Sequence, residues 1–483
     1  MKLNFDNSFA RLPNYFFTKL NPTSVKEPRL VHANHETAAL LEISDKDIQK
    51  KTFANYFSGN THLPGSEPLA TVYSGHQFGY YVPQLGDGRA LLLGEVVNQQ
   101  GERWDVQLKG AGQTPYSRMG DGRSVLRSAI REYLCSAAMH ALNIPTTRAL
   151  SIVATNELVY REVPEPGAVL TRVAESHIRF GHFEYFYYTN QHQALKELAD
   201  YVLHRHYPDI PTNVEGYLHL FEQAVLKTAQ LIAKWQAVGF CHGVMNTDNM
   251  SILGLTIDYG PFGFLNAFNA NHICNSSDYT GRYAFDQQPT IAFWNLLALA
   301  QALTPLIAAE QLQETVARFD NELQAHYYQL VQQKLGLERT HNTDKQLVAE
   351  LFSLLQRDKV DYTVFFRRLS NFNPQKDNDF LAYLFENKKE LNTWLARYKD
   401  RLTHEEMPIS VRQEKMKKIN PKYILRNHLA QQAISQAYEN QNYREIGKLY
   451  TILQKPFDEQ PEYELYSLPP PKDLAEIKVS CSS

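Results

Sequence analysis

Two neighbouring segments decide how this chain of 483 residues folds: His242-Gly243-Val244-Met245-Asn246-Thr247-Asp248-Asn249-Met250 and Ile257-Asp258-Tyr259-Gly260. The first begins soon after Gly239, a residue type that commonly ends helices. Asn249 and Asp258 offer the hard oxygen atoms that Mg²⁺ prefers when it bridges phosphate oxygens. Together the segments predict a phosphate- and metal-binding loop that follows a helix.

The spacing resembles the catalytic and metal-binding segments of protein-kinase-like phosphotransferases, with one position changed. In small-molecule kinases of that fold, a His-Gly-Asp opens the loop, an Asn follows it, and an Asp comes on the next strand. Here Asn249 lies seven residues after His242 and Asp258 follows, but Val244 occupies the position of the usual base. Valine cannot accept a proton, so the protein is either inert or uses another residue in a rearranged site.

Length and composition are those of an ordinary globular protein, with 43% hydrophobic and 21% charged residues. A chain of 483 residues is too long for one typical core, so we expect two lobes or domains. Lys and Arg number 49 against 52 Asp and Glu, so the net charge of −3 favours neither nucleic acid nor a membrane surface as a partner. The first residues lack an apolar signal core, and we expect a cytoplasmic protein.

Hydrophobic periodicity divides the chain into a strand-rich part and a helical part. One helix, 124–142, interrupts the strands, and after about residue 190 helices are predicted at 195–207, at 214–238 and from 291 to about 450. The predicted strands are 90–97, 104–109, 149–154, 159–163 and 169–174, bounded by Gly, Asn-Glu or Pro-Gly turns.

This order predicts an α+β, bilobal protein-kinase-like fold with a strand-rich N-lobe and a helical C-lobe. We expect residues 1–70 to form an N-terminal extension packed on the fold and 71–185 to form the nucleotide-binding N-lobe. Residues 186–460 form the helical C-lobe with the catalytic loop, and 461–483 form a tail that carries Cys481.

A strand lysine and a helix glutamate support the kinase-like interpretation. Lys109 ends the predicted strand 104–109, and Glu132 lies in the next helix. In protein kinases such a lysine holds nucleotide phosphates and is oriented by the glutamate. A solvated surface pair is the alternative for these two residues alone.

Two Gly-Asp-Gly-Arg turns, 86–89 and 120–123, suit phosphate oxygens, because glycine frees backbone N–H groups next to a guanidinium. Arg172 and Arg179 add permanent, bidentate charges of the kind that bind polyphosphates. The alternatives are ordinary Asp-Gly turns and surface arginines. Asp248 is the nearest carboxylate that could replace the base missing at Val244, or else it caps a turn.

Longer blocks resemble the selenoprotein O family of pseudokinase-fold protein adenylyltransferases, known in bacteria as YdiU. They run from about residue 70 to the end of the chain. The matching blocks are Tyr73–Gly79, Gln84–Arg89, Gln107–Arg118, Gly120–Arg123, His242–Gly263, Asn420–Asn427 and Val479–Ser483.

The resemblance implies that ATP binds flipped relative to a kinase, so that AMP is transferred to hydroxyl groups of Ser, Thr or Tyr in substrate proteins. It implies Asp248 as the proton acceptor, Asn249 and Asp258 as Mg²⁺ ligands, and Glu132 as the partner of Lys109. Mn²⁺ in place of Mg²⁺ and UMP transfer stay open. The implied ATP contacts are Gly86, Gly88, Arg89, Lys109, Asp121, Gly122, Arg172, Arg179 and Asp258.

Two questions remain open at this point. Cys481 stands where animal members of the family carry selenocysteine. Either Cys481 pairs with Cys274 in a redox-sensitive disulfide, or both cysteines are free thiols. A kinase that transfers the γ-phosphate and a catalytically dead pseudokinase that only binds partners are the alternatives to AMP transfer.

Overall fold

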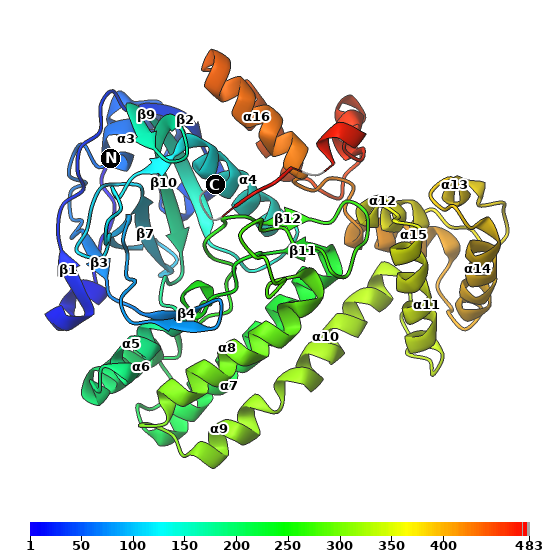
Figure 1. Cartoon of the computed structure of the whole chain (residues 1–483), viewed down its shortest axis with the longest axis horizontal. Helices are drawn as coiled ribbons and strands as arrows, with labels where there is room; N and C mark the ends of the chain where they lie inside the picture. The colour runs from blue at the N-terminus through cyan, green and yellow to red at the C-terminus, as the bar shows by residue number, and fades with distance from the viewer. Residues whose placement is uncertain (476, 481–483) are drawn as a thin grey trace.

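An antiparallel β-sheet from the first part of the chain forms one side of the molecule, on the left in Figure 1. The computed structural model describes residues 1–475 and 477–480. Within them, eight strands form the sheet in the order β1-β3-β6-β7-β10-β9-β2, and β8 pairs with β10. The strands are β1 Phe17–Lys19, β2 Arg29–Ala33, β3 Leu69–Thr71, β6 Ala90–Val97, β7 Arg103–Lys109, β8 Ser124–Val125, β9 Arg148–Tyr160 and β10 Pro164–Ala174. Strands β1 and β2 lie within residues 1–70, so this segment is part of the sheet.

Different helices cover the two faces of the sheet, because side chains alternate along a strand. Leu91 and Leu93 of β6 share a core with Phe53 and Phe57 of helix α3. Leu92 points to the other face and belongs to the core that includes helix α4. The helices of this part are α1 His35–Leu40, α2 Asp45–Ile48, α3 Lys51–Phe57 and α4 Leu126–Ala141.

Most of the predicted elements of this part are confirmed. Strand β6 has the predicted bounds, β7 begins one residue earlier than predicted, and α4 accounts for the helix predicted at 124–142. The strand predicted at 159–163 is only partly confirmed, because residues 159 and 160 end β9 and residues 161–163 form the bend between β9 and β10. The Asn-Glu and Pro-Gly turns are wrong. Pro164 and Pro166 are paired with residues of β9, and the register of the two strands shifts between Pro166 and Ala168. Proline has no backbone N–H to donate, and such an irregularity is where a strand tolerates it.

Helices dominate the chain after the sheet, which confirms the predicted mixed α/β composition. Helix α7 has the predicted bounds, and α6 accounts for the helix predicted at 195–207. Helix α5 is absent from the sequence prediction, since its run of Phe and Tyr residues favours strands. The next helices along the chain are α5 Phe180–Tyr188, α6 His192–His206, α7 Val214–Val238, α8 Gln288–Leu303, α9 Ala309–Val316 and α10 Phe319–Lys334.

A second helical group lies at one end of the molecule and has its own core around Trp394 and Tyr398 (Figure 1). Its helices are α11 Asp344–Arg357, α12 Tyr362–Leu369, α13 Asp379–Ala382, α14 Lys388–Leu402 and α15 Ile409–Ile419. The chain then returns to pack helices α16 Asn427–Asn440 and α17 Arg444–Leu453 against α4.

The last described residues, 477–480, lie against the segment around Asn275. Val479 pairs with Asn275, and its carbonyl oxygen accepts a hydrogen bond of 2.8 Å from the backbone N–H of Ser276. Across residues 1–475 and 477–480, we find no helix with the length and apolar character that crossing a membrane requires.

Candidate active site

A cavity of about 540 Å³ lies where the sheet meets the segments that follow α7. Both Gly-Asp-Gly-Arg turns and the predicted catalytic loop line it. The aspartates in its lining are Asp87, Asp121, Asp248 and Asp258. The cationic side chains are Arg89, Lys109, Arg118, Arg123, Arg161, Arg172 and Arg179. Because the whole chain has a net charge of −3, the positive charge is concentrated at this cavity, which suits an anionic ligand.

Buried contacts hold the predicted catalytic loop at both ends. Gly239 ends α7 in the left-handed conformation, with φ of 76°. Short strands β11 Phe240–Cys241 and β12 Gly263–Phe264 then pair with each other on either side of the loop. His242 Nε2 donates a hydrogen bond of 2.9 Å to the carbonyl oxygen of Ile257. The loop is therefore tied to the residue that precedes Asp258.

Asp248 lies in the short helical turn η3, Thr247–Asn249, with its side chain buried in the cavity wall. Its Oδ2 accepts a hydrogen bond of 3.2 Å from Gln77 Nε2. Among the described residues its Oδ1 has no hydrogen-bond partner. Burial raises the pKa of the Asp248 carboxyl to about 7, although nearby Arg179 opposes the shift. Such a carboxylate is suited to accept a proton near neutral pH.

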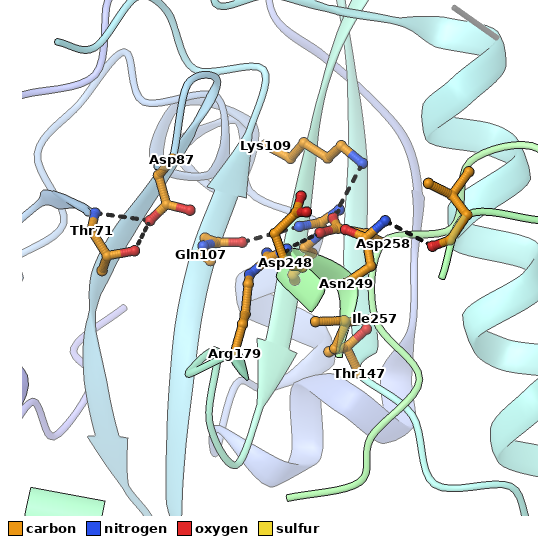
Figure 2. Close-up of polar contacts among 12 residues, drawn as sticks. Thr71, Asp87, Gln107, Lys109, Thr147, Arg179, Asp248, Asn249, Ile257 and Asp258 are labelled. Atoms are coloured by element: carbon orange, nitrogen blue, oxygen red, sulfur yellow. Dashed lines mark hydrogen bonds and ion pairs between the residues drawn. The ribbon is translucent and has the colours of Figure 1, made fainter. Parts of the chain in front are cut away.

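Asp258 faces the same cavity in a different electrostatic environment (Figure 2). Arg172 and Arg179 each donate a hydrogen bond to one of its oxygens, and Lys109 Nζ lies 3.8 Å from Oδ1. Burial alone would raise the pKa of Asp258, but these three cations hold it well below its usual range. Its φ of 58° is uncommon for a residue with a side chain, which indicates that the surrounding contacts fix this conformation.

Lys109 and Glu132 lie together, as the resemblance implies, with 2.6 Å between Lys109 Nζ and Glu132 Oε2. Arg172 Nε donates to the other oxygen of Glu132 over 2.5 Å. Burial would raise the pKa of Glu132, but Arg172 and Lys109 outweigh it and lower the pKa. Burial and the neighbouring Arg172 lower the pKa of Lys109 to about 8. Glu132 thereby orients two cations toward the cavity.

Asn249 lies beside Asp258 in the site (Figure 2). Its Nδ2 donates a hydrogen bond of 3.0 Å to the carbonyl oxygen of Val244, which fixes the orientation of the amide. No group of three or more His, Cys, Asp or Glu within residues 1–475 and 477–480 could hold a metal ion. A Mg²⁺ ion held by Asn249 and Asp258 would take its remaining ligands from phosphates and water, as is common for this ion.

The first Gly-Asp-Gly-Arg turn packs tightly against the segment around Tyr116. A Cβ atom on Gly86, which has φ of 73°, would lie 2.5 Å from Tyr116 Cγ, and one on Gly88 would lie 2.8 Å from the Tyr116 carbonyl oxygen. Asp87 Oδ2 accepts hydrogen bonds of 2.9 and 2.7 Å from the N–H and hydroxyl of Thr71 (Figure 2). Exposed Arg89 is left pointing to the cavity.

The second turn uses its aspartate differently. Asp121 accepts hydrogen bonds of 2.8 and 3.0 Å from both Nη atoms of Arg161. Gly122 has φ of 68°, and a Cβ there would lie 2.1 Å from the carbonyl carbon of Gly112. The two turns therefore reach one cavity, with Asp87 buried behind its turn and Asp121 paired at the rim.

Comparison with known proteins identifies the family. The family model described as "Protein adenylyltransferase SelO" matches residues 1–454. The chain belongs to the SelO family. It is 50% identical over 483 residues to the "Protein nucleotidyltransferase YdiU" of Thiobacillus denitrificans, covering 100% of this chain and 99% of the relative. The protein of the same description from Pseudomonas aeruginosa strain LESB58 is 50% identical over 481 residues, again with 100% and 99% covered. This SelO-family chain is therefore an enzyme of the protein nucleotidyltransferase class.

The candidate site of this SelO-family chain contains contacts that sequence reasoning missed. Gln77 is the hydrogen-bond partner of Asp248, and Arg161 is the partner of Asp121. Gln77 stands in a block that carries the family resemblance, but a glutamine between His76 and Phe78 has no chemical signature of its own. Only the fold brings residue 77 to residue 248, and no signal in the chain indicates that contact.

The predicted redox pair is described on one side only, because Cys481 lies outside the described residues. Cys274 is buried, and its Sγ donates to the carbonyl oxygen of Pro261 over 2.9 Å. Pro261 lines the cavity. Val479 pairs with Asn275, so the tail two residues before Cys481 lies next to Cys274.

Proposed function

We propose that this chain transfers AMP from ATP to Ser, Thr or Tyr hydroxyl groups of substrate proteins. The contrast between Asp248 and Asp258 carries the proposal. Asp248 offers a buried oxygen without a partner, and Asp258 gathers three cations in the same cavity. One carboxylate is thus suited to take a proton and the other to organise charge around a polyphosphate.

The proposed arrangement is that of a bilobal, protein-kinase-like enzyme in which ATP lies flipped. The order of strand Lys109, helix Glu132, catalytic loop and Asp258 supports the kinase-like part. Val244, which is 9% exposed in the cavity wall, supports the change of reaction, because no base stands at its position. In the flipped orientation the α-phosphate faces Asp248, and the β- and γ-phosphates face Lys109, Arg172 and Arg179.

The transfer step follows from these positions. The hydroxyl oxygen of the substrate protein forms a bond to the α-phosphorus while its proton passes to the Asp248 carboxylate. The bond from the α-phosphorus to the bridging oxygen breaks, and the electron pair leaves with diphosphate. Lys109, Arg172 and Arg179 offset the charge that develops on the departing group. Glu132 keeps Lys109 and Arg172 in place through its two oxygens.

Asn249 and Asp258 are the residues that would hold Mg²⁺ with the nucleotide. Their donor set, one carboxylate and one amide oxygen, suits an ion that takes phosphate oxygens as further ligands. When bound, the ion neutralises charge on the phosphates. The second combination of metal and nucleotide to test at this site is Mn²⁺ with UTP, from which the enzyme would transfer UMP.

We also propose that Cys274 and Cys481 form a disulfide that makes activity depend on redox state. The pairing of Val479 with Asn275 supports it, since the tail lies against the neighbour of Cys274. Peptide mapping without reductant, after oxidation, is expected to find the linked peptides. Finding both thiols free under those conditions removes the proposal.

The position of the label in ATP tests the proposed reaction. The enzyme is incubated with casein as acceptor and ATP labelled at either the α- or the γ-phosphate, and label bound to casein and to the enzyme itself is measured. We expect protein to retain label from the α-position only. Label from the γ-position alone would show a kinase, and no label from either would favour a non-catalytic binding protein.

A further inference from the structure

A buried carboxylate outside the cavity lining holds two segments of the site together. Glu184 lies in α5, and its side chain is 0% exposed. Its Oε1 lies 2.6 Å from His76 Nδ1, and its Oε2 accepts a hydrogen bond from the Thr247 hydroxyl. The backbone N–H of His76 also donates to Thr247 Oγ1 over 2.7 Å. Glu184, His76 and Thr247 thus form one closed hydrogen-bonded cluster.

Each partner of Glu184 immediately precedes a residue of the active site. His76 precedes Gln77 in strand β4, Gly75–Gln77, and Thr247 precedes Asp248 in η3. Gln77 in turn donates to Asp248 Oδ2. The two segments are 171 residues apart in the sequence, so their register depends on contacts between them.

The surroundings of the cluster leave it little freedom. The His76 ring lies 5.2 Å from the ring of Trp294 and 5.3 Å from that of Tyr81, between centroids. No Lys or Arg among the described residues forms an ion pair with Glu184. A buried carboxylate costs free energy unless it is hydrogen-bonded, so Glu184 favours the one arrangement that satisfies both of its oxygens.

We propose that Glu184 is a positioning residue for the transfer reaction. It fixes β4 against η3, so that Gly75 packs against Oδ1 of Asp248 and the Gln77 amide donates to Oδ2, which holds the carboxylate in place in the cavity wall. This role rests on the proposed function of Asp248. A second bridge, in which the Phe78 N–H donates to the Tyr283 hydroxyl and that hydroxyl donates to Asn246, holds the same segments nearby. Loss of Glu184 should therefore misplace Asp248 locally without unfolding the site.

Steady-state kinetics of Glu184→Ala and Glu184→Gln test the role. We expect Glu184→Ala to lower kcat for AMP transfer by about 10- to 100-fold and to change KM for ATP by less than about twofold, because misplacement affects the reacting atoms and not the phosphate contacts. Glu184→Gln should recover most of kcat, since its amide oxygen can accept from Thr247 and its NH₂ can donate to His76.

Asp344→Ala is the matched control, because it also removes a buried carboxylate that lies outside the cavity lining; the partner of Asp344 is Arg401. We expect it to lower the melting temperature and to leave kcat unchanged. If Glu184→Ala fails to fold, Thr247→Val removes the hydroxyl that makes two of the three hydrogen bonds of the cluster. It should lower kcat and leave KM for ATP unchanged. Wild-type kcat in Glu184→Ala, or in Thr247→Val where that replaces it, overturns the proposal, as does a Glu184→Gln variant no better than Glu184→Ala.

The two proposals fail in different ways. The wild-type enzyme is assayed first with α- and γ-labelled ATP, and γ-label in protein would refute AMP transfer whatever the variants do. If the wild type transfers AMP and Glu184→Ala raises KM for ATP as strongly as it lowers kcat, the positioning role is wrong while the proposed function stands.

Discussion

Asp248 and Asp258 share one cavity, yet the chain surrounds them in opposite ways. Asp258 is contacted by Arg172, Arg179 and Lys109, which hold its pKa well below the usual range. Asp248 has one amide partner, and burial raises its pKa to about 7. The difference separates a permanently charged carboxylate, suited to metal and phosphates, from one that can exchange a proton. The predictions below either break this contrast or measure its parts.

The largest effect is expected when the charge of Asp258 is removed. Asp258→Asn keeps the shape of the side chain but leaves three buried cations without their shared carboxylate and removes a charged ligand from the proposed metal site. We expect AMP transfer to fall by about 10³-fold or more, measured as the initial rate with α-labelled ATP. Circular dichroism establishes that the variant is folded. Transfer within about tenfold of wild type would refute the assignment of Asp258.

A smaller effect is expected at Lys109, which lies within ion-pair distance of Glu132 and Asp258. Lys109→Met removes one charge-assisted contact to phosphate, which is worth about 1.5–3 kcal/mol and corresponds to about 10- to 100-fold weaker ATP binding. Isothermal titration with ATP measures the change in Kd. Unchanged affinity would contradict the placement of the phosphates beside Lys109.

Gly75→Ala should disturb the Asp248 side of the contrast alone. A Cβ atom there would lie 2.7 Å from Asp248 Oδ1 and 2.9 Å from Asp248 Cβ, so the carboxylate must move. We expect about a tenfold loss of kcat with KM for ATP unchanged. Gly447→Ala serves as the control, because its nearest neighbour, His32 Nε2, lies 3.3 Å away and outside the cavity. Full activity in Gly75→Ala would show that the position of the Asp248 carboxylate does not matter.

The smallest effect is expected for Cys274→Ser under reducing conditions. The serine hydroxyl can replace the thiol as donor to the Pro261 carbonyl oxygen, so transfer should stay within about twofold of wild type. After oxidation the wild-type rate should change and the variant rate should not. Equal responses of the two proteins to oxidant would exclude a redox role for Cys274.

How far the sequence predicts this molecule depends on the range of the interaction involved. Helix α7 and strand β6 follow from local periodicity, and both have the predicted bounds. Local rules fail at Pro164 and Pro166, which read as a turn but continue β10, because pairing with β9 outweighs turn propensity. Helix α5 is missed for a related reason, since tertiary packing places its aromatic residues in a helix.

The candidate site shows the same limit. The motif residues Lys109, Glu132, Asp248, Asn249 and Asp258 carry recognisable chemistry at recognisable spacing, and the fold brings them into one region. Gln77 and Glu184 act through contacts between distant segments, for which a single sequence has no signal. Their importance becomes visible only when β4 is seen against η3.

Single-turnover AMP transfer by Asp248→Asn at saturating ATP tests the contrast most directly. Because Asp258 and its cations remain, ATP should bind within about threefold of wild type, while loss of the proton acceptor should slow transfer by about 10²- to 10⁴-fold. A transfer rate close to that of the wild-type enzyme would contradict the proposal that Asp248 accepts the proton while Asp258 organises the charge around the phosphates.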